Sequence, residues 1–332
     1  MRFPVQVLAF ALLLLIISGC DGNEGAGETV EPTVQVVTTI YPLADIVSEL
    51  GGEEVMVSHL LPAGASPHTY EPTVEQARLL DQADLLVHVG AGLDDWAIKL
   101  AEASGSGPVI LDLSRHVDLI ASAGYKSLGD PEDEDHGHSD CDHDHDGHND
   151  CDHHDCDHDH GPADPHFWLD PLIVRDSICP AIHSQLILIA PGSEDYFDLR
   201  LSEYREDITV LHEEIEAAVS EFNRQSFISF HSAWQYFAKR YGLEEAAVVA
   251  RFPGQEPSAG WLAELVELIR HGNMGAIFAE PQFPSDLAER IAEESGTVVK
   301  TVDPLGGEGV PGRESYLAMM RFNLAAFQEG LK

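Results

Sequence analysis

The feature that most constrains the fold is an alternation of short apolar runs with helical patterns, which occurs twice along the chain. Strand-like runs occupy 34–39, 55–60, 85–89 and 109–112 in the first half and 227–230, 247–250, 276–279 and 297–302 in the second. Helical patterns lie between them, at 43–50, 74–81, 94–103, 234–241, 261–271, 285–294 and 314–328. Continuous apolar strands that alternate with helices are typical of parallel sheets covered on both faces. We therefore predict an α/β protein of two lobes, each with a four-stranded, mainly parallel sheet flanked by helices.

A long helical pattern lies between the two series. Pro191-Gly192 precedes it, and from Phe197 to Phe222 apolar residues recur every three or four positions without a Gly or Pro. This spacing predicts one helix of about 30 residues, about 45 Å long, which should restrain hinge opening. The predicted domains are a first lobe over 34–190, a linking helix over 191–222 and a second lobe over 223–332.

The segment 130–160, a His-rich tract, is dense in metal-ligating groups. It holds nine histidines, three cysteines and fourteen acidic residues, with no Lys, Arg, aliphatic or aromatic side chain. Nothing in it can pack into a core, so we predict a disordered loop over 129–163 that takes up metal ions; the alternative is a solvated acidic linker. Its cysteines, Cys141, Cys151 and Cys156, could bind metal or oxidise to one another. The accessory ligands would be His136, His138, His143, His145, His148, His153, His154, His158 and His160.

The N-terminus has the pattern of an export signal. Arg2 is followed by an apolar run over 5–17, too short for a permanent membrane span, and Ile17-Ser18-Gly19-Cys20 resembles a bacterial lipobox. We predict a signal peptide over 1–20, lipidation of Cys20 and a flexible tether over 21–33. The alternative is an ordinary signal peptide with a chance cysteine. The expected location is extracytoplasmic, anchored in the periplasm or on the outer face of the cytoplasmic membrane.

The formal net charge of −40 excludes a class of partners. Nucleic-acid binding needs basic patches, so no nucleic-acid partner is expected. A strongly acidic chain suits a cationic ligand instead, without identifying the cation.

Four residues outside the acidic segment have the setting of metal ligands. His68 and His166 stand in proline-braced loops, and His231 and Asp303 each end a predicted strand. Ligands bind at strand ends in α/β sheets, and these four supply two donors from each lobe to the cleft. Three imidazoles and one carboxylate match the tetrahedral coordination that Zn²⁺ favours. The other histidines outside the tract are given structural or surface roles: His59, His88, His116, His183, His212 and His271.

Five motifs, in order, make the chain similar to a known family. It resembles the cluster A-I metal-binding proteins of ABC importers and, within them, the ZnuA-like zinc-binding proteins. The motifs are Ser66-Pro67-His68-Thr69-Tyr70-Glu71-Pro72, Asp164-Pro165-His166-Phe167-Trp168-Leu169-Asp170-Pro171, Phe230-His231-Ser232-Ala233-Trp234-Gln235-Tyr236-Phe237, Gly254-Gln255-Glu256-Pro257-Ser258 and Val302-Asp303-Pro304-Leu305-Gly306.

The resemblance implies two lobes joined by one long helix, with metal bound between them by His68, His166, His231 and Asp303. Manganese-type members have Glu at the third ligand position, so His231 indicates zinc. A His-rich loop before the second ligand is also typical of zinc-type members, although its cysteines are less usual. The fourth ligand varies among zinc-type members, where water or a different carboxylate can replace Asp303.

Two further carboxylates, Glu71 and Glu280, are predicted near the cleft. We assign them either to orienting the ligands from a second layer or to plain structural roles.

The predicted function is the extracytoplasmic zinc-binding component of an ABC importer. It would capture Zn²⁺ as a monomer and deliver it to a membrane permease powered by a cytoplasmic ATPase, with the His-rich segment as accessory chelator. It would not be an enzyme. One alternative is a zinc hydrolase with Glu71 or Glu280 as base, and another is a metal-sequestering surface adhesin. Manganese or iron is the alternative metal.

Overall fold

The structure is a computed structural model that describes residues 34–103, 107–122, 163–250, 256–272 and 274–332. The predictions on the signal peptide, the tether and Cys20 lie outside these residues. So do those on the nine tract histidines and the three tract cysteines.

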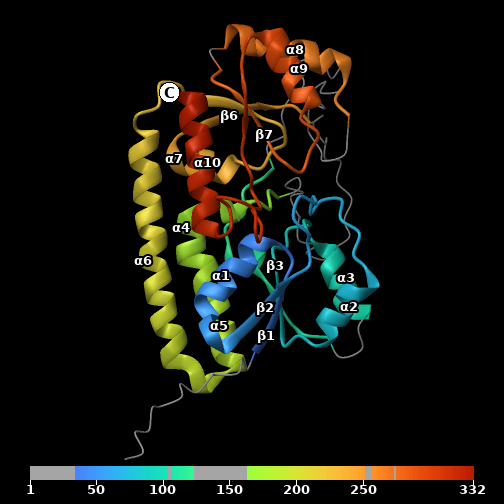
Figure 1. Ribbon diagram of the computed structural model, residues 1–332, viewed down its shortest axis with the longest axis vertical. Coiled ribbons are helices and arrows are strands. Elements are labelled where there is room, and N and C mark those ends of the chain that lie inside the picture. The colour runs from blue at the N-terminus through green and yellow to red at the C-terminus, as the bar shows by residue number, and fades with distance from the viewer. Residues whose placement is uncertain (1–33, 104–106, 123–162, 251–255, 273) are drawn as a thin grey trace, which may run out of the picture. The chain divides into compact units, whose positions relative to one another are not determined.

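Two four-stranded sheets form the centres of the two lobes (Figure 1). All neighbouring strands pair in parallel, in the orders β2-β1-β3-β4 and β6-β5-β7-β8. The two sheets have the same topology, in which the second strand along the chain lies at one edge, next to the first. The strands of the first sheet are β1 (Val34–Thr38), β2 (Val55–His59), β3 (Leu85–His88) and β4 (Val109–Asp112). Those of the second are β5 (Ser226–Ser229), β6 (Glu244–Val248), β7 (Ile277–Ala279) and β8 (Val299–Thr301).

Helices cover both faces of the first sheet. Its helical segments are α1 (Tyr41–Gly51), η1 (Gly52–Glu54), α2 (Val74–Asp81), α3 (Asp95–Ala103) and η2 (Leu113–His116). One face buries Val37 and Leu86 against α2 and α3, and the other buries Val36 and Val87 against α1. Burial on both faces explains why these strands read as continuous apolar runs.

The second sheet is covered in the same way. Its helices are α7 (Gln235–Tyr241), α8 (Ala259–His271), α9 (Asp286–Ser295) and α10 (Tyr316–Leu331). Ile228 and Ile277 face α8 and α9, whereas Phe227 and Phe278 pack around Phe327 of α10.

The segment that leads to the linking helix is itself helical from Pro171 to Ile189. It comprises α4 (Pro171–Ile173), a π-helical turn η4 (Val174–Ile178) and α5 (Cys179–Ile189), and η3 (Phe167–Leu169) and η5 (Pro191–Ser193) flank it. By length and composition alone it could cross a membrane. It packs against α1 and α6, however, and it buries Cys179 completely.

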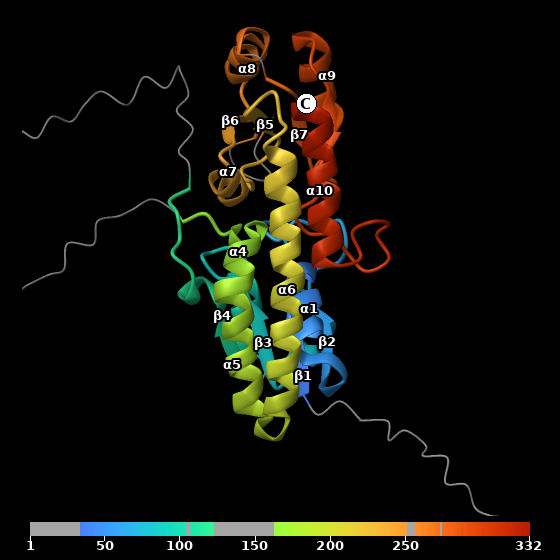
Figure 2. The same ribbon diagram turned by 90° about the vertical axis from the view of Figure 1, so that its left-hand side faces the viewer.

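The linking helix α6 (Glu194–Val219) runs along both lobes and packs on α1 and α5 of the first and on α10 of the second (Figures 1 and 2). It is 26 residues long, about 39 Å, and therefore shorter than predicted. It ends at Val219, and the chain then turns. The backbone N–H groups of Asn223 and Arg224 in this turn both donate to Leu331 O at the end of the C-terminal helix α10.

One hydrophobic cluster extends along α6 into both lobes. It contains Val36 of β1, Ile208 and Leu211 of α6, and Phe227 of β5. A core shared in this way opposes a wide opening between the lobes, because opening would expose its apolar surface to water. The predicted fold class is confirmed: two α/β lobes with parallel sheets, joined by one long helix.

Candidate metal centre

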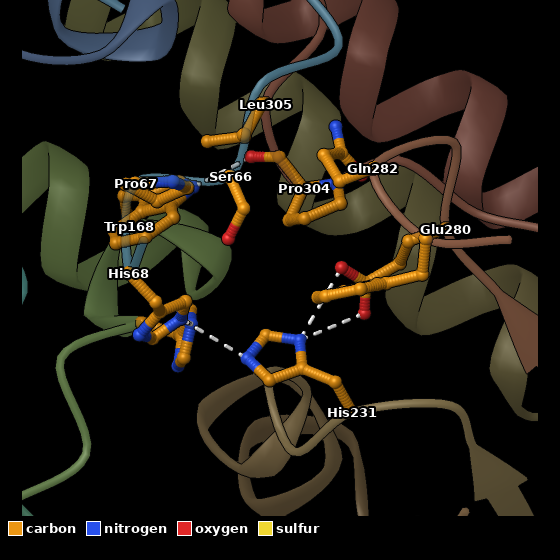
Figure 3. A pocket seen from close by; sticks show the side chains of 11 residues that line it. Ser66, Pro67, His68, Trp168, His231, Glu280, Gln282, Pro304 and Leu305 are labelled. Atoms are coloured by element: carbon orange, nitrogen blue, oxygen red, sulfur yellow. Dashed lines mark hydrogen bonds and ion pairs between the residues drawn. The ribbon is translucent and has the colours of Figure 1, made fainter. Parts of the chain in front are cut away.

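Three histidines from distant parts of the chain meet between the lobes. Nε2 of His68 lies 3.3 Å from Nε2 of His166 and 3.2 Å from Nε2 of His231. One ring nitrogen of each residue lies within 4.8 Å of the other two, which is close enough to bind a single ion. Figure 3 shows His68 and His231 facing each other across the pocket.

The loop after β2 holds His68. Its prolines restrict the backbone, and the indole Nε1 of Trp96 on α3 donates a hydrogen bond to Pro67 O at 3.1 Å. Gln76 on α2 also donates to Tyr70 Oη, at 2.7 Å, and to Leu60 O. The rigid loop therefore fixes His68 from both sides.

An Asx-type turn holds His166. Oδ1 of Asp164 accepts hydrogen bonds from the backbone N–H of His166 at 2.9 Å and from its Nδ1 at 2.8 Å. With Nδ1–H donated to this carboxylate, the lone pair of Nε2 is left to face the other histidines. Asp164 and His166 are both buried.

A carboxylate orients His231 in the same way from the second lobe. His231 follows β5, and its Nδ1 lies 3.1 and 3.3 Å from the two carboxylate oxygens of Glu280 (Figure 3). Glu280 is 4% exposed, so this interaction is shielded from water. The carboxylates of Asp164 and Glu280 therefore orient the rings of His166 and His231 so that both Nε2 atoms face the pocket.

Burial and charge set the protonation of the three imidazoles. Burial, helped by repulsion from the two other imidazoles, lowers the pKa of His68 to about 2, and burial holds the pKa of His166 well below its usual value. Burial also acts to lower the pKa of His231, but the charge and hydrogen bond of Glu280 outweigh it and raise that pKa. Two of the three donors are thus neutral and ready to bind a cation.

Comparison with known proteins identifies the family. The profile of the family described as "Zinc-uptake complex component A periplasmic" (ZnuA) matches residues 36–330. The chain belongs to the ZnuA family.

Two relatives and one solved structure illustrate the similarity within the ZnuA family. The chain is 27% identical over 331 residues to the zinc-binding lipoprotein AdcA of Streptococcus pneumoniae serotype 4, covering 98% of this chain and 60% of AdcA. It is 27% identical over 329 residues to the high-affinity zinc uptake system protein ZnuA of Bacillus subtilis, covering 98% and 96%. A crystal structure of ZnuA shares the fold with a TM-score of 0.73 at 24% identity, covering 90% of this chain and 100% of that one.

Beside the three histidines, the wall of the pocket has polar side chains. Ser66, Gln282 and Glu280 line it, together with Trp168 and Pro304 (Figure 3). Among the described residues, Ser66 Oγ and Gln282 Oε1 are buried without a hydrogen-bond partner. Buried polar atoms normally have partners, so these two suit a group that enters with the ligand.

Asp303, predicted as the fourth ligand, is not brought to the three histidines. Its Oδ1 accepts hydrogen bonds from the backbone N–H groups of Leu305 and Gly306 at 3.0 and 3.1 Å and from Gln282 Nε2 at 3.0 Å, and its Oδ2 pairs with Arg313 at 2.9 Å. Both oxygens are thus engaged in holding the loop after β8. Gln282, which donates to Asp303, itself lines the pocket, whereas Asp303 does not.

The two predicted orienting carboxylates have different positions. Glu280 contacts His231, whereas Glu71 is exposed and does not line the pocket. Asp164 stands in one of the five motifs, but the motif alone assigns it no role. The signal that could have identified it is the Asp-Pro-His spacing, because an Asp side chain commonly bonds to the backbone two residues later.

Five of the six other histidines outside the tract have separate partners, and the sixth, His116, is exposed. Within the described part of the chain, the group that could hold a metal contains only His68, His166 and His231. His88 pairs with Asp94, His183 with Asp198, His212 with Tyr241, His271 with Glu267, and His59 packs against the ring of Tyr41.

Proposed function

We propose that the chain is the extracytoplasmic zinc-binding component of an ABC-type zinc importer. The observation that carries the proposal is the convergence of three imidazole Nε2 atoms, from loops of both lobes, at separations of 3.2 and 3.3 Å. Zn²⁺ would be the cargo, bound by His68, His166 and His231 and released to a membrane permease driven by a cytoplasmic ATPase. Membership of the ZnuA family supports this role.

The donor set favours zinc over manganese or iron. Imidazole nitrogen suits Zn²⁺, whereas Mn²⁺ prefers carboxylate, carbonyl and water oxygens. The two carboxylates that contact these rings, Asp164 and Glu280, each face an Nδ1 atom and not the common centre of the Nε2 atoms. Three nitrogen donors leave one tetrahedral position, which water or a carboxylate would fill.

Two further parts of the proposal rest on the sequence. The segment 130–160 would act as a flexible chelator that raises the zinc concentration near the cleft, and it would bind ions more weakly because coordination must order it. Lipidated Cys20 would anchor the protein at the membrane surface.

The geometry favours capture over hydrolysis. A hydrolytic zinc site needs a general base within reach of the metal-bound water. Glu280 directs both oxygens to His231, and Glu71 is exposed outside the pocket, so neither alternative base is placed for that task. Zinc-dependent ester or peptide hydrolysis that is lost in His231→Ala would favour the enzyme instead.

The decisive experiment is a zinc titration against a competing chelator. It compares the mature protein, a version that lacks 130–160, and that version with His68→Ala. His59→Ala in the same background is the matched control, because this histidine packs against Tyr41 and lies outside the three-histidine group.

The expected result is one tight zinc in the shortened protein, unchanged by His59→Ala and abolished by His68→Ala. If tight binding instead disappears with the tract, the protein is a His-rich chelator and the importer proposal fails. Delivery is tested separately by zinc-dependent growth of cells in which the permease is present and the chain carries His68→Ala.

A further inference from the structure

The hydroxyl of Tyr236 connects the second lobe to the segment that holds His166. Tyr236 lies on α7, five positions after His231, and is 3% exposed. Its hydroxyl donates a hydrogen bond to Asp164 O at 3.0 Å and accepts one from the backbone N–H of Ile120 at 3.1 Å. Both functions of the hydroxyl are therefore engaged with the first lobe.

The two first-lobe segments at this hydroxyl are themselves paired. Asp164 N donates to Ile120 O at 2.9 Å, and Ala121 and Ala163 form an antiparallel bridge. The hydroxyl of Tyr236 thus bonds to both of these paired backbone segments. The segments cannot shift relative to α7 without breaking these hydrogen bonds.

The path from Tyr236 to the metal ligand is short. Asp164 gives its carbonyl to Tyr236 and its Oδ1 to both the backbone N–H and Nδ1 of His166. Any movement of the Asp164 backbone therefore changes where Nε2 of His166 points. On the other side, Tyr236 and His231 belong to the same short segment.

We propose that Tyr236 is a positioning residue, which sets the separation of His166 and His231 by tying Asp164 to the second lobe. The inference rests on the proposed zinc-binding function. A zinc site needs donor atoms placed to within about 0.2 Å of ideal metal–ligand distances, so a bond that fixes two ligands across a lobe boundary controls affinity. Burial raises the pKa of Tyr236 to about 12, and the phenol therefore keeps its proton for Asp164 at neutral pH.

A purely structural role is the alternative. The ring of Tyr236 also fills the core, where it packs edge-on against Phe167 with 6.4 Å between ring centroids. Tyr236→Phe keeps this ring and removes only the hydroxyl. If the variant does not fold, Tyr236→Met, which has no hydroxyl and can fill an irregular gap, takes its place.

A matched control removes another hydroxyl between the lobes. Tyr41 on α1 donates to Glu314 O at 2.6 Å, and this bond leads to none of the three histidines. Tyr41→Phe therefore loses an inter-lobe hydrogen bond of the same kind without affecting the support of His166.

The test measures zinc affinity of the full mature chain by chelator competition, with enough weak chelator present to empty weaker sites. Tyr236→Phe should bind zinc about tenfold more weakly, the low end of the range for residues that support a metal ligand. Tyr41→Phe should bind as wild type. The visible absorption of the one-to-one Co²⁺ complex should change in Tyr236→Phe alone, because it reports ligand geometry and not stability.

A double-mutant cycle shows whether Tyr236 acts through Asp164. The combined variant Tyr236→Phe, Asp164→Ala should bind zinc no more weakly than Asp164→Ala alone, because alanine removes the side chain that links the Asp164 backbone to His166. Zinc affinity within twofold of wild type and an unchanged Co²⁺ spectrum in Tyr236→Phe would overturn the inference. If the wild type itself lacks a tight site that depends on His68, the proposed function has failed instead.

Discussion

Nδ1 of His231 lies 3.1 Å from Glu280 Oε1, while Nε2 of the same ring lies 3.2 Å from Nε2 of His68. One imidazole thus has a buried carboxylate on one side and the shared centre of three nitrogens on the other. A carboxylate in this position fixes the ring and makes its second nitrogen a stronger donor to a cation.

Replacement of Glu280 by Gln should weaken zinc binding about 10- to 100-fold, because the neutral amide neither fixes the ring as firmly nor raises its basicity. Chelator competition measures the change. Glu71→Gln is the control, since Glu71 is exposed outside the pocket and its loss should leave the affinity unchanged. Equal effects of the two substitutions would contradict the role assigned to Glu280.

Among the three imidazoles, only His231 should contribute a proton to the pH dependence of zinc affinity, while Asp164 beside His166 also titrates in this range because burial raises its pKa to about 7. Burial keeps His68 and His166 neutral, whereas the pKa of His231 is raised by Glu280 against the effect of burial. Below the pKa of His231, zinc must displace one proton, so affinity should fall about tenfold per pH unit. Above that pKa the contribution of His231 should be constant.

Chelator competition between pH 5.5 and 8 measures this slope. Glu280→Gln should move the break in the curve to lower pH, because the raising influence is removed. The proton on His231 also stabilises the zinc-free fold at low pH, and this contribution is lost as pH rises through the raised pKa. A slope of three protons would show that all three imidazoles titrate together and would contradict the assignment.

Much of the architecture follows from local sequence. Short apolar runs such as 85–87 of β3 are buried on both faces, a pattern typical of parallel strands covered by helices. Strand boundaries are harder to predict where backbone pairing overrides composition. The strand β6 begins at Glu244, since Ser226 pairs with Glu244, although the apolar run starts only at 247.

The candidate site was predictable in its nitrogen donors and less so in its carboxylates. Proline bracing and strand ends identify His68, His166 and His231 because these features fix backbone position. Which carboxylate supports which ligand depends on side-chain direction across the lobe boundary. Asp303 pairs with Arg313, whereas Glu280 pairs with His231. The spacing of these residues in the sequence does not predict this difference in partners.

Asp303→Asn should destabilise the protein more than it weakens zinc binding. The side chain of Asp303 is 3% exposed and pairs with Arg313, which stacks over Phe322 at 4.6 Å. Breaking a buried pair costs about 3 kcal/mol, so urea unfolding of the zinc-free protein should show a loss of this order. Zinc affinity should change less than about threefold.

The opposite outcome for Asp303 is equally informative. A loss of zinc affinity of 100-fold or more, with stability little changed, would mean that Asp303 leaves Arg313 and binds the metal. Arg313→Lys is the companion variant, because it keeps the charge but loses the planar guanidinium. It should lower stability without affecting zinc.

Ser66→Ala should change stability and zinc affinity in opposite directions. In the described chain Ser66 Oγ is buried at the wall of the pocket without a hydrogen-bond partner, a cost of about 1–3 kcal/mol to the zinc-free fold. Removing the hydroxyl should raise the free energy of unfolding, measured in urea with chelator present.

If the Ser66 hydroxyl bonds to the group that completes the coordination of zinc, its loss should weaken zinc binding about three- to tenfold. Ser232→Ala is the control, since that hydroxyl bonds to Glu245 and does not line the pocket. Reduced stability together with unchanged zinc affinity in Ser66→Ala would place the hydroxyl in the fold and remove it from the metal centre.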